Sequence, residues 1–186
     1  MSAPRPPRAG RIPRPLDVGA LDALAVRYVA RYATTSAKLL AYLRRKLKER
    51  GWDADAPADL PAVVERCVAA GFVDDRAYAE SKSEALARRG FGNRRIDQAL
   101  FGAGIDRAIV TELTLSDDVA RDAAQRFARR KRFGRFGPPT DPDGRRRQLA
   151  AMLRAGHSFQ IARECLAQLT EHDDDPEQFV TFRDDL

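Results

Sequence analysis

Positively charged side chains gather at four places in this sequence, and clusters of this kind can bind anions. Most are arginines, whose planar guanidinium fork suits phosphate and carboxylate groups alike. Contacts of this kind to nucleic-acid phosphates are independent of base sequence and weaken as salt is added. The residues that we predict to bind a partner or a nucleic acid are Arg44, Arg45, Lys46, Lys48, Arg88, Arg89, Arg94, Arg95, Arg129, Arg130, Lys131, Arg132, Arg145, Arg146 and Arg147.

The same clusters also have an ordinary interpretation as solvated outer faces of helices, and the charge pattern favours neither. Four aromatic residues beside them bear on the choice, because such rings stack on bases or anchor in a partner. These are Tyr42, Phe91, Phe133 and Phe136. We expect most of them to pack in the core, and Phe91 and Phe136, which glycine flanks, to be the exposed ones.

Residues that could carry out catalysis or bind a metal are scarce. His157 and His172 are the only histidines, and no Ser-His-Asp order, phosphate-binding glycine loop or metal-ligand spacing occurs. We expect His157 to lie at a helix end or on the surface. The acid pairs at 74–75 and 117–118 each open a helix, so capping explains them better than a metal site. The prediction is a protein that is not an enzyme, without catalytic residues, cofactor or metal.

The net charge of +6 is divided unevenly along the chain. Residues 1–15 carry four arginines, five prolines and no acid, which predicts a disordered basic arm. Residues 171–186 carry seven acids against one arginine and form an acidic tail. The rest of the chain has a charge of +8. The body itself is therefore basic, which fits a nucleic acid or an acidic protein as partner.

Cysteine usage and hydropathy indicate the compartment. Cys67 and Cys165 fit no metal or redox spacing, and we expect two small buried side chains in a reduced protein. No run approaches the roughly 18 apolar residues that span a bilayer. The N-terminus lacks the apolar region of a secretory signal. We predict a cytoplasmic monomer that does not contact membranes.

Helical periodicity extends from Leu16 to Leu169 with almost no strand pattern, and one helix recurs three times. Each copy carries an apolar stripe and basic residues, and ends at a glycine of the kind that stops helices. These glycines are 53 and 52 residues apart: Gly51, Gly104 and Gly156. An apolar residue stands four positions before each: Leu47, Leu100 and Met152.

These patterns predict an all-α fold of nine helices in three tandem three-helix repeats, forming an elongated, curved helical array. The repeats span 16–72, 73–115 and 116–170, between the basic arm and the acidic tail. On such an array the basic clusters would make a discontinuous positive stripe. The residues expected to cap helices are Ser36, one of Asp74 and Asp75, Asp106 and Ser158.

The middle repeat contains three distinctive stretches: Gly71-Phe72-Val73-Asp74-Asp75-Arg76-Ala77-Tyr78-Ala79, Arg88-Arg89-Gly90-Phe91-Gly92-Asn93-Arg94-Arg95-Ile96, and Leu100 with Gly104-Ile105. Their order and spacing resemble the central repeat of the RecX family, regulators of the RecA recombinase. The stretch from Ser36 to Gly51 resembles the first repeat, although Ala33-Thr34-Thr35 replaces a more polar lead-in. The third repeat resembles the family's only in outline. The likeness covers roughly Leu21 to Leu169.

The resemblance implies a helical modulator, mainly an inhibitor, that binds the RecA–DNA filament. It would limit filament extension, ATP hydrolysis, strand exchange and co-protease activity, and so act in DNA repair, recombination and the SOS response. The family has no active site to carry over. Two alternatives remain: a helical repeat protein that binds single- or double-stranded DNA without RecA, and a scaffold for protein interactions.

Overall fold

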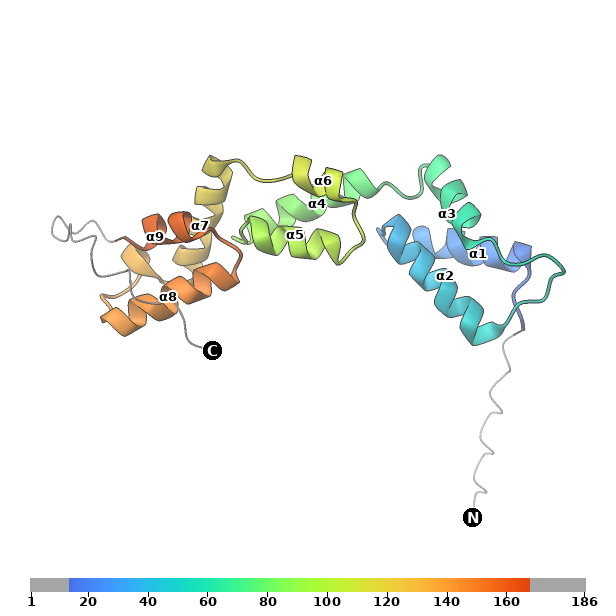
Figure 1. The fold of residues 1–186 in the computed structure, drawn as a ribbon, viewed down its shortest axis with the longest axis horizontal. Helices are drawn as coiled ribbons and strands as arrows, with labels where there is room; N and C mark the ends of the chain where they lie inside the picture. The colour runs from blue at the N-terminus through green and yellow to red at the C-terminus, as the bar shows by residue number, and fades with distance from the viewer. Residues whose placement is uncertain (1–13, 168–186) are drawn as a thin grey trace, which may run out of the picture. The chain divides into compact units, whose positions relative to one another are not determined.

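The computed structural model describes residues 14–167, and this part of the chain is helical apart from turns and one isolated β-bridge (Figure 1). Its α-helices are α1 Val18–Val29, α2 Ser36–Arg50, α3 Leu60–Ala69, α4 Asp75–Arg88, α5 Asn93–Phe101, α6 Arg107–Glu112, α7 Asp117–Lys131, α8 Pro142–Arg154 and α9 Phe159–Leu166. The prediction of an all-α fold is confirmed. The acidic tail and nearly all of the basic arm lie outside the described residues.

The chain divides into two compact units, each made of two segments. Unit 1 comprises residues 14–83 with 99–113, and unit 2 comprises residues 84–98 with 114–167. The two units therefore share α4 and α5 of the middle repeat. The boundaries of the three repeats and the curvature of the array stay predictions.

The core of unit 1 forms where α1, α2 and α3 pack on one another. Leu39 and Leu43 on the predicted stripe of α2 are fully buried, and Leu47 is half-buried against the same core. Tyr28 of α1 stacks on Tyr42 of α2 with ring centroids 4.1 Å apart. Tyr42 is therefore largely a packing residue, as expected for most of the aromatic candidates.

The core of unit 2 forms between α7, α8 and α9, with the short 3-10 helix η1 (Gly134–Phe136) against them. Its fully buried residues are mostly small, so the helices approach closely: Ala124, Ala128, Met152 and Ala162. Phe91 and Phe136 are half-buried against this core. The expectation that these two rings are exposed is therefore only partly correct.

The predicted caps of α4, α6 and α9 are confirmed, and the predicted cap of α2 is wrong. Asp106 and Ser158 accept hydrogen bonds from the backbone of α6 and α9, and Asp74 accepts one from Ala77 N at 2.8 Å. Ser36 is not a cap but the first residue of α2. The preceding Thr35 caps that helix through its hydroxyl, which accepts from Lys38 N at 3.2 Å.

In unit 1 the start of α2 lies against the end of α5, and we call this contact the first junction. The Thr35 hydroxyl is fully buried and donates to the Ala103 carbonyl at 2.6 Å. A methyl group on Gly104 would overlap the Cβ of Ala37, so the backbone approaches closely here. Asp75 joins the same junction by accepting from Ser36 N at 2.8 Å. Asp75 thus serves α2 while Asp74 caps α4.

The second junction lies in unit 2, where the start of α5 meets the end of α8. Gly92 N donates to the Ala155 carbonyl at 3.0 Å, and Arg94 N donates to the Gly156 carbonyl at 3.2 Å. A Cβ on Gly92 would lie 2.5 Å from the carbonyl carbon of Gly156. Ala155 stands 52 residues after Ala103, so the two junctions use equivalent carbonyls. A hydroxyl is the donor in the first and a backbone amide in the second.

The first junction can be tested by removing its hydroxyl. Thr35→Val should lower the free energy of unfolding by about 2–3 kcal/mol, because it leaves the Ala103 carbonyl and Lys38 N without this partner. Urea unfolding followed by the fluorescence of Trp52, the single tryptophan of the chain and a residue of unit 1, measures the change. Thr35→Ser keeps the hydroxyl, so its free energy of unfolding should fall much less. Equal losses in the two variants would contradict this account.

The end of α2 and the start of α8 take no part in the two junctions and make other hydrogen bonds. Gly51 O accepts from Leu16 N at 3.0 Å, and Leu16 O accepts from Asp53 N at 2.8 Å. Leu16 is fully buried. At the start of α8, the Asp141 side chain accepts from Gly144 N at 2.6 Å, and Pro142 occupies the first helical position. The N-terminal segment therefore covers one helix end, and a side-chain cap occupies the other.

Between residues 14 and 167, no helix combines the length and the apolar character that a membrane crossing needs. Cytoplasmic location stays a prediction.

Candidate nucleic-acid interface

The basic cluster of unit 1 lies on α2. Arg44, Arg45 and Lys48 are exposed, and Lys46 is half-buried. Glu49 pairs with Lys46 at 2.6 Å and with Arg45 at 3.6 Å. The hydrogen bond from Lys46 is the main cause of the lowered pKa of Glu49. Within the described chain, Arg44 and Lys48 have no carboxylate partner and are the freest cations of this cluster.

In unit 2 the structure joins two clusters that are far apart in the sequence. Arg130 of α7 donates through Nη1 to the carbonyl of Arg89 at the end of α4. Gly90 lies directly on α7, since a Cβ there would be 3.0 Å from Ala123 O. The result is one surface, the α4–α7 basic surface, formed by Arg88, Arg89, Arg129, Arg130, Lys131 and Arg132. All six side chains are exposed.

Aromatic rings support several arginines of unit 2. The Arg89 guanidinium lies 5.3 Å from the centroid of Phe91. Arg129 and Arg135 lie 5.2 Å and 4.9 Å from the centroid of Phe136. Such contacts stabilise a cation and orient its planar group. The structure thus shows Phe91 and Phe136 holding arginines over a half-buried ring, which differs from the predicted role of free stacking platforms.

Three further arginines gather around a hollow at the second junction. Arg94 and Arg95 come from the first turn of α5, and Arg154 comes from the last turn of α8. The hollow has a volume of about 390 Å³, and the rest of its lining is Gln98, Leu153 and Gly156. The sequence predicted Arg94 and Arg95 but missed Arg154, which lies about two helical turns beyond the Arg145–Arg147 cluster.

The last cluster lies in the first turns of α8, where Arg145, Arg146 and Arg147 are exposed. Arg146 pairs with Asp143, and Arg147 lies 3.9 Å from Asp141. Arg145 has no carboxylate partner in the described part of the chain. Exposed pairs of this kind contribute little energy and leave the cation accessible to a stronger anion.

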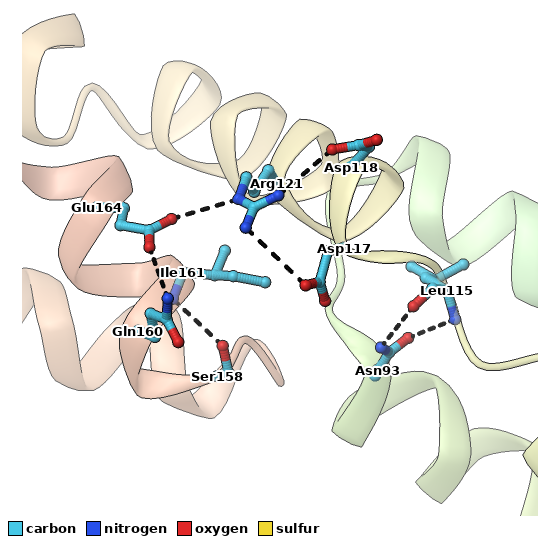
Figure 2. A network of polar contacts seen from close by, with 9 residues as sticks. All are labelled: Asn93, Leu115, Asp117, Asp118, Arg121, Ser158, Gln160, Ile161 and Glu164. Carbon is cyan, nitrogen blue, oxygen red and sulfur yellow. Dashed lines mark hydrogen bonds and ion pairs between the residues drawn. The ribbon is translucent and has the colours of Figure 1, made fainter.

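The predicted capping role is wrong for Asp117 and Asp118, because both lie within the first turn of α7 and no side chain caps its start. Asp117 and Asp118 lie 3.9 Å and 3.3 Å from Arg121, which also reaches Glu164 of α9 at 3.4 Å (Figure 2). In the same view, the Asn93 side chain exchanges two hydrogen bonds with the backbone of Leu115. Over residues 14–167, no three His, Cys, Asp or Glu side chains gather in a way that could hold a metal ion.

His157 is not on the surface, which corrects part of the prediction for it. Its side chain is 2% exposed, its Nε2 lies 3.2 Å from the Gly90 carbonyl, and its ring meets Phe127 edge-on at 5.8 Å. Burial lowers the pKa of His157, and the hydrogen bond to Gly90 acts in the opposite direction. The residue lies just past the end of α8 and helps to hold the end of α4 in unit 2.

This burial predicts that unit 2 loses stability in mild acid. The unfolded chain takes up a proton near the ordinary pKa of 6.5, whereas folded His157 takes it up only at lower pH. The contribution is therefore complete above pH 6.5 and falls below it, by at most about 1.4 kcal/mol per pH unit. Urea unfolding followed by circular dichroism at pH 7.5 and 5.5 should show a smaller loss in His157→Gln than in wild type. His172→Gln is the control, and an equal loss in wild type and His157→Gln would contradict the assignment.

The exposed aromatic residues are ones that the sequence did not indicate as binding residues. Among the described residues, Phe72 is the most exposed large apolar side chain at 57%, with Phe159, Phe101 and Tyr32 at about half. A local signal existed for Phe72, because it stands between Gly71 and the apolar Val73. Neighbouring side chains outside a helix point to opposite sides, so Phe72 faces solvent when Val73 is buried.

Comparison with known proteins identifies the family of this chain. The family model described as the second three-helix domain of RecX matches residues 74–113. The regulatory protein RecX of Myxococcus xanthus is 34% identical over 169 residues, which are 86% of this chain and 90% of that protein. This chain belongs to the RecX family. The regulatory protein RecX of Agrobacterium fabrum is 32% identical over 148 residues, covering 76% of this chain and 78% of that protein.

Solved RecX structures share the fold. The crystal structure of RecX from Lactobacillus salivarius matches with a TM-score of 0.64 at 17% identity, covering 80% of this chain and 93% of that one. A second crystal structure, of a regulatory protein RecX, matches with a TM-score of 0.57 at 22% identity. The resemblance and the arrangement in helical repeats are therefore confirmed.

The residues that carried the RecX resemblance turn out to build the scaffold. Val73 is buried, Asp74 caps α4, and Asp75 and Gly104 make the first junction. Gly92 makes the second. The family motif thus explains how successive helices are joined, and the binding role of the exposed arginines stays a prediction.

Proposed function

We propose that this RecX-family protein regulates the RecA recombinase, mainly as an inhibitor, and is not an enzyme. It binds the RecA–DNA filament and limits filament extension, ATP hydrolysis, strand exchange and co-protease activity. The observation that carries the proposal is the 34% identity to a regulatory protein RecX over 90% of the length of that protein.

The surface chemistry supports the proposal. Cations without a carboxylate partner in the described chain occur in both units, on α2 and α8 and at the hollow of the second junction. A nucleoprotein filament presents phosphates and acidic side chains along its length, and dispersed arginines suit such a partner. We infer that the predicted basic residues form the contact surface, with Arg154 added to them.

The test is a titration of RecA ATP hydrolysis on single-stranded DNA. We expect equimolar protein to lower the rate, and to lower it more when it is present before the filament grows. Unchanged ATP hydrolysis together with unchanged strand exchange would exclude the proposal.

A second candidate, DNA binding without RecA, is favoured by the arginine-lined hollow. It predicts equal affinity for naked single-stranded DNA and for RecA–DNA filaments. RecA regulation predicts tighter binding to the filament than to either component alone. Fluorescence anisotropy with labelled DNA, with and without RecA, separates the two candidates.

A further inference from the structure

The hollow at the second junction brings three guanidinium groups together from two helices. Arg94 and Arg95 of α5 and Arg154 of α8 line it, and all three side chains are exposed. No carboxylate belongs to its lining, which is completed by Gln98, Leu153 and Gly156. Three positive charges that face a common space repel one another, and an anion in that space removes the repulsion.

The place of these arginines on α5 also leaves them without an acidic partner. Arg94 and Arg95 stand in the first turn of α5, where the helix dipole favours acids, and this turn contains none. The Ala155 and Gly156 carbonyls, just past the end of α8, accept from Gly92 N and Arg94 N, so they satisfy backbone amides. They bring no ionised group to the guanidinium groups.

The one acid close by in the helix does not neutralise them. Asp97 is half-buried, burial raises its pKa, and it makes no ion pair in the described chain. The polar side chain that does reach an arginine is neutral, since Gln98 Oε1 accepts from Arg95 Nη1 at 3.5 Å. The charges of Arg94, Arg95 and Arg154 therefore remain available to a ligand.

We propose that the hollow formed by Arg94, Arg95 and Arg154 binds a backbone phosphate of DNA. This deepens the proposed function and rests on it, because the DNA would be that of the RecA filament. A backbone phosphate shares one negative charge between two non-bridging oxygens, which accept from several donors in different directions and so suit guanidinium groups from two helices. A single carboxylate is matched by one arginine fork. Because no base edge is read, the contact is independent of sequence.

The test uses the full chain and a fluorescein-labelled thymidine oligonucleotide without RecA, with anisotropy measured over a range of salt concentrations. Arg154→Gln should weaken binding about tenfold, as expected for the loss of one charge-assisted hydrogen bond. The slope of log affinity against log salt should fall by about 0.7, the value for one phosphate contact on a single strand. Arg154→Lys should keep the slope and recover only part of the affinity, because it lacks the fork.

Arg163→Gln is the matched control, since Arg163 is another exposed arginine of unit 2, located on α9 and outside the hollow. It should change neither affinity nor slope. Equal weakening by Arg154→Gln and Arg163→Gln would overturn the proposal, because net charge alone would then explain the effect. An unchanged affinity in Arg154→Gln, with thermal unfolding as in wild type, would also overturn it.

Parallel assays of RecA ATP hydrolysis keep this proposal separate from the proposed function. If wild type inhibits RecA and Arg154→Gln binds DNA normally, the phosphate site is wrong and the regulatory function stands. If Arg154→Gln loses DNA binding and wild type leaves RecA unaffected, the site stands and the regulatory function fails. If Arg154→Gln loses inhibition of RecA but keeps DNA binding, the hollow contacts the RecA protein and not DNA. That result would overturn the phosphate site.

Discussion

Gly156→Ala is expected to reduce the free energy of unfolding of unit 2 by about 3 kcal/mol or more, the upper range for overpacked sites. Gly156 has a φ of +93°, which disfavours any residue with a side chain. A Cβ there would also lie 2.7 Å from the Cβ of Arg95, in a junction held by backbone hydrogen bonds. The start of α5 would have to move away from the end of α8.

Gly71→Ala is the matched control for this prediction. Gly71 has a φ of +73°, but a Cβ there would meet nothing within 4 Å. Its replacement should lower the free energy of unfolding only by the cost of a left-handed backbone at alanine, about 1–2 kcal/mol. Circular dichroism reports on both units, whereas Trp52 fluorescence reports on unit 1, so the Gly156 variant should change the first signal more than the second. Equal losses for the two variants would show that the junction does not restrict residue 156.

The second large effect is expected from reversing charge at the start of α5. Arg94→Glu combined with Arg95→Glu should raise the concentration needed for half-inhibition of RecA ATP hydrolysis at least about tenfold, because attraction becomes repulsion at the hollow. The helix should tolerate the change, since acids in a first turn are favoured by the helix dipole. A loss of inhibition would then reflect binding and not unfolding.

A double variant with the same charge change controls for net charge. Arg107→Glu combined with Arg163→Glu reverses two exposed arginines that lie outside the predicted clusters and outside the hollow. It should inhibit RecA nearly as well as wild type. If both double variants lose inhibition to the same degree, total charge and not the hollow governs the interaction. Circular dichroism of each variant verifies that it is folded.

The fold could be predicted from the sequence because helices leave local signals. The i, i+4 stripe Leu39–Leu43 and the glycine at 51 identify α2, and Asp106 and Ser158 identify the starts of α6 and α9. The error at Ser36 was one residue, since Thr35 and Ser36 are both good caps. The junctions could not be predicted, because Thr35 and Ala103 are 68 residues apart and nothing local marks their contact.

The candidate site was predicted in composition but not in arrangement. Pairs such as Arg45–Glu49 and Glu84–Arg88 follow i, i+4 spacing, so the partial neutralisation of those arginines was available from the sequence. The α4–α7 basic surface and the role of Arg154 depend on contacts between distant segments. Rings such as Phe136 were recognised as neighbours of basic residues, but their support of Arg129 and Arg135 required the packed core of unit 2.

The covered end of α2 and the capped start of α8 limit how many repeats can be joined. A junction needs a helix end that offers carbonyls and a helix start that offers a donor. At the end of α2 the Gly51 carbonyl is occupied by Leu16 N, and at the start of α8 Asp141 caps the helix while Pro142 has no N–H. The start of α8 thus offers neither the hydroxyl nor the backbone amide that donates in the two junctions, so the described part of the chain leaves no place for a second copy to add the same junction. The series is self-terminating, and we expect copies of this protein to remain separate and not to grow head to tail into a fibre.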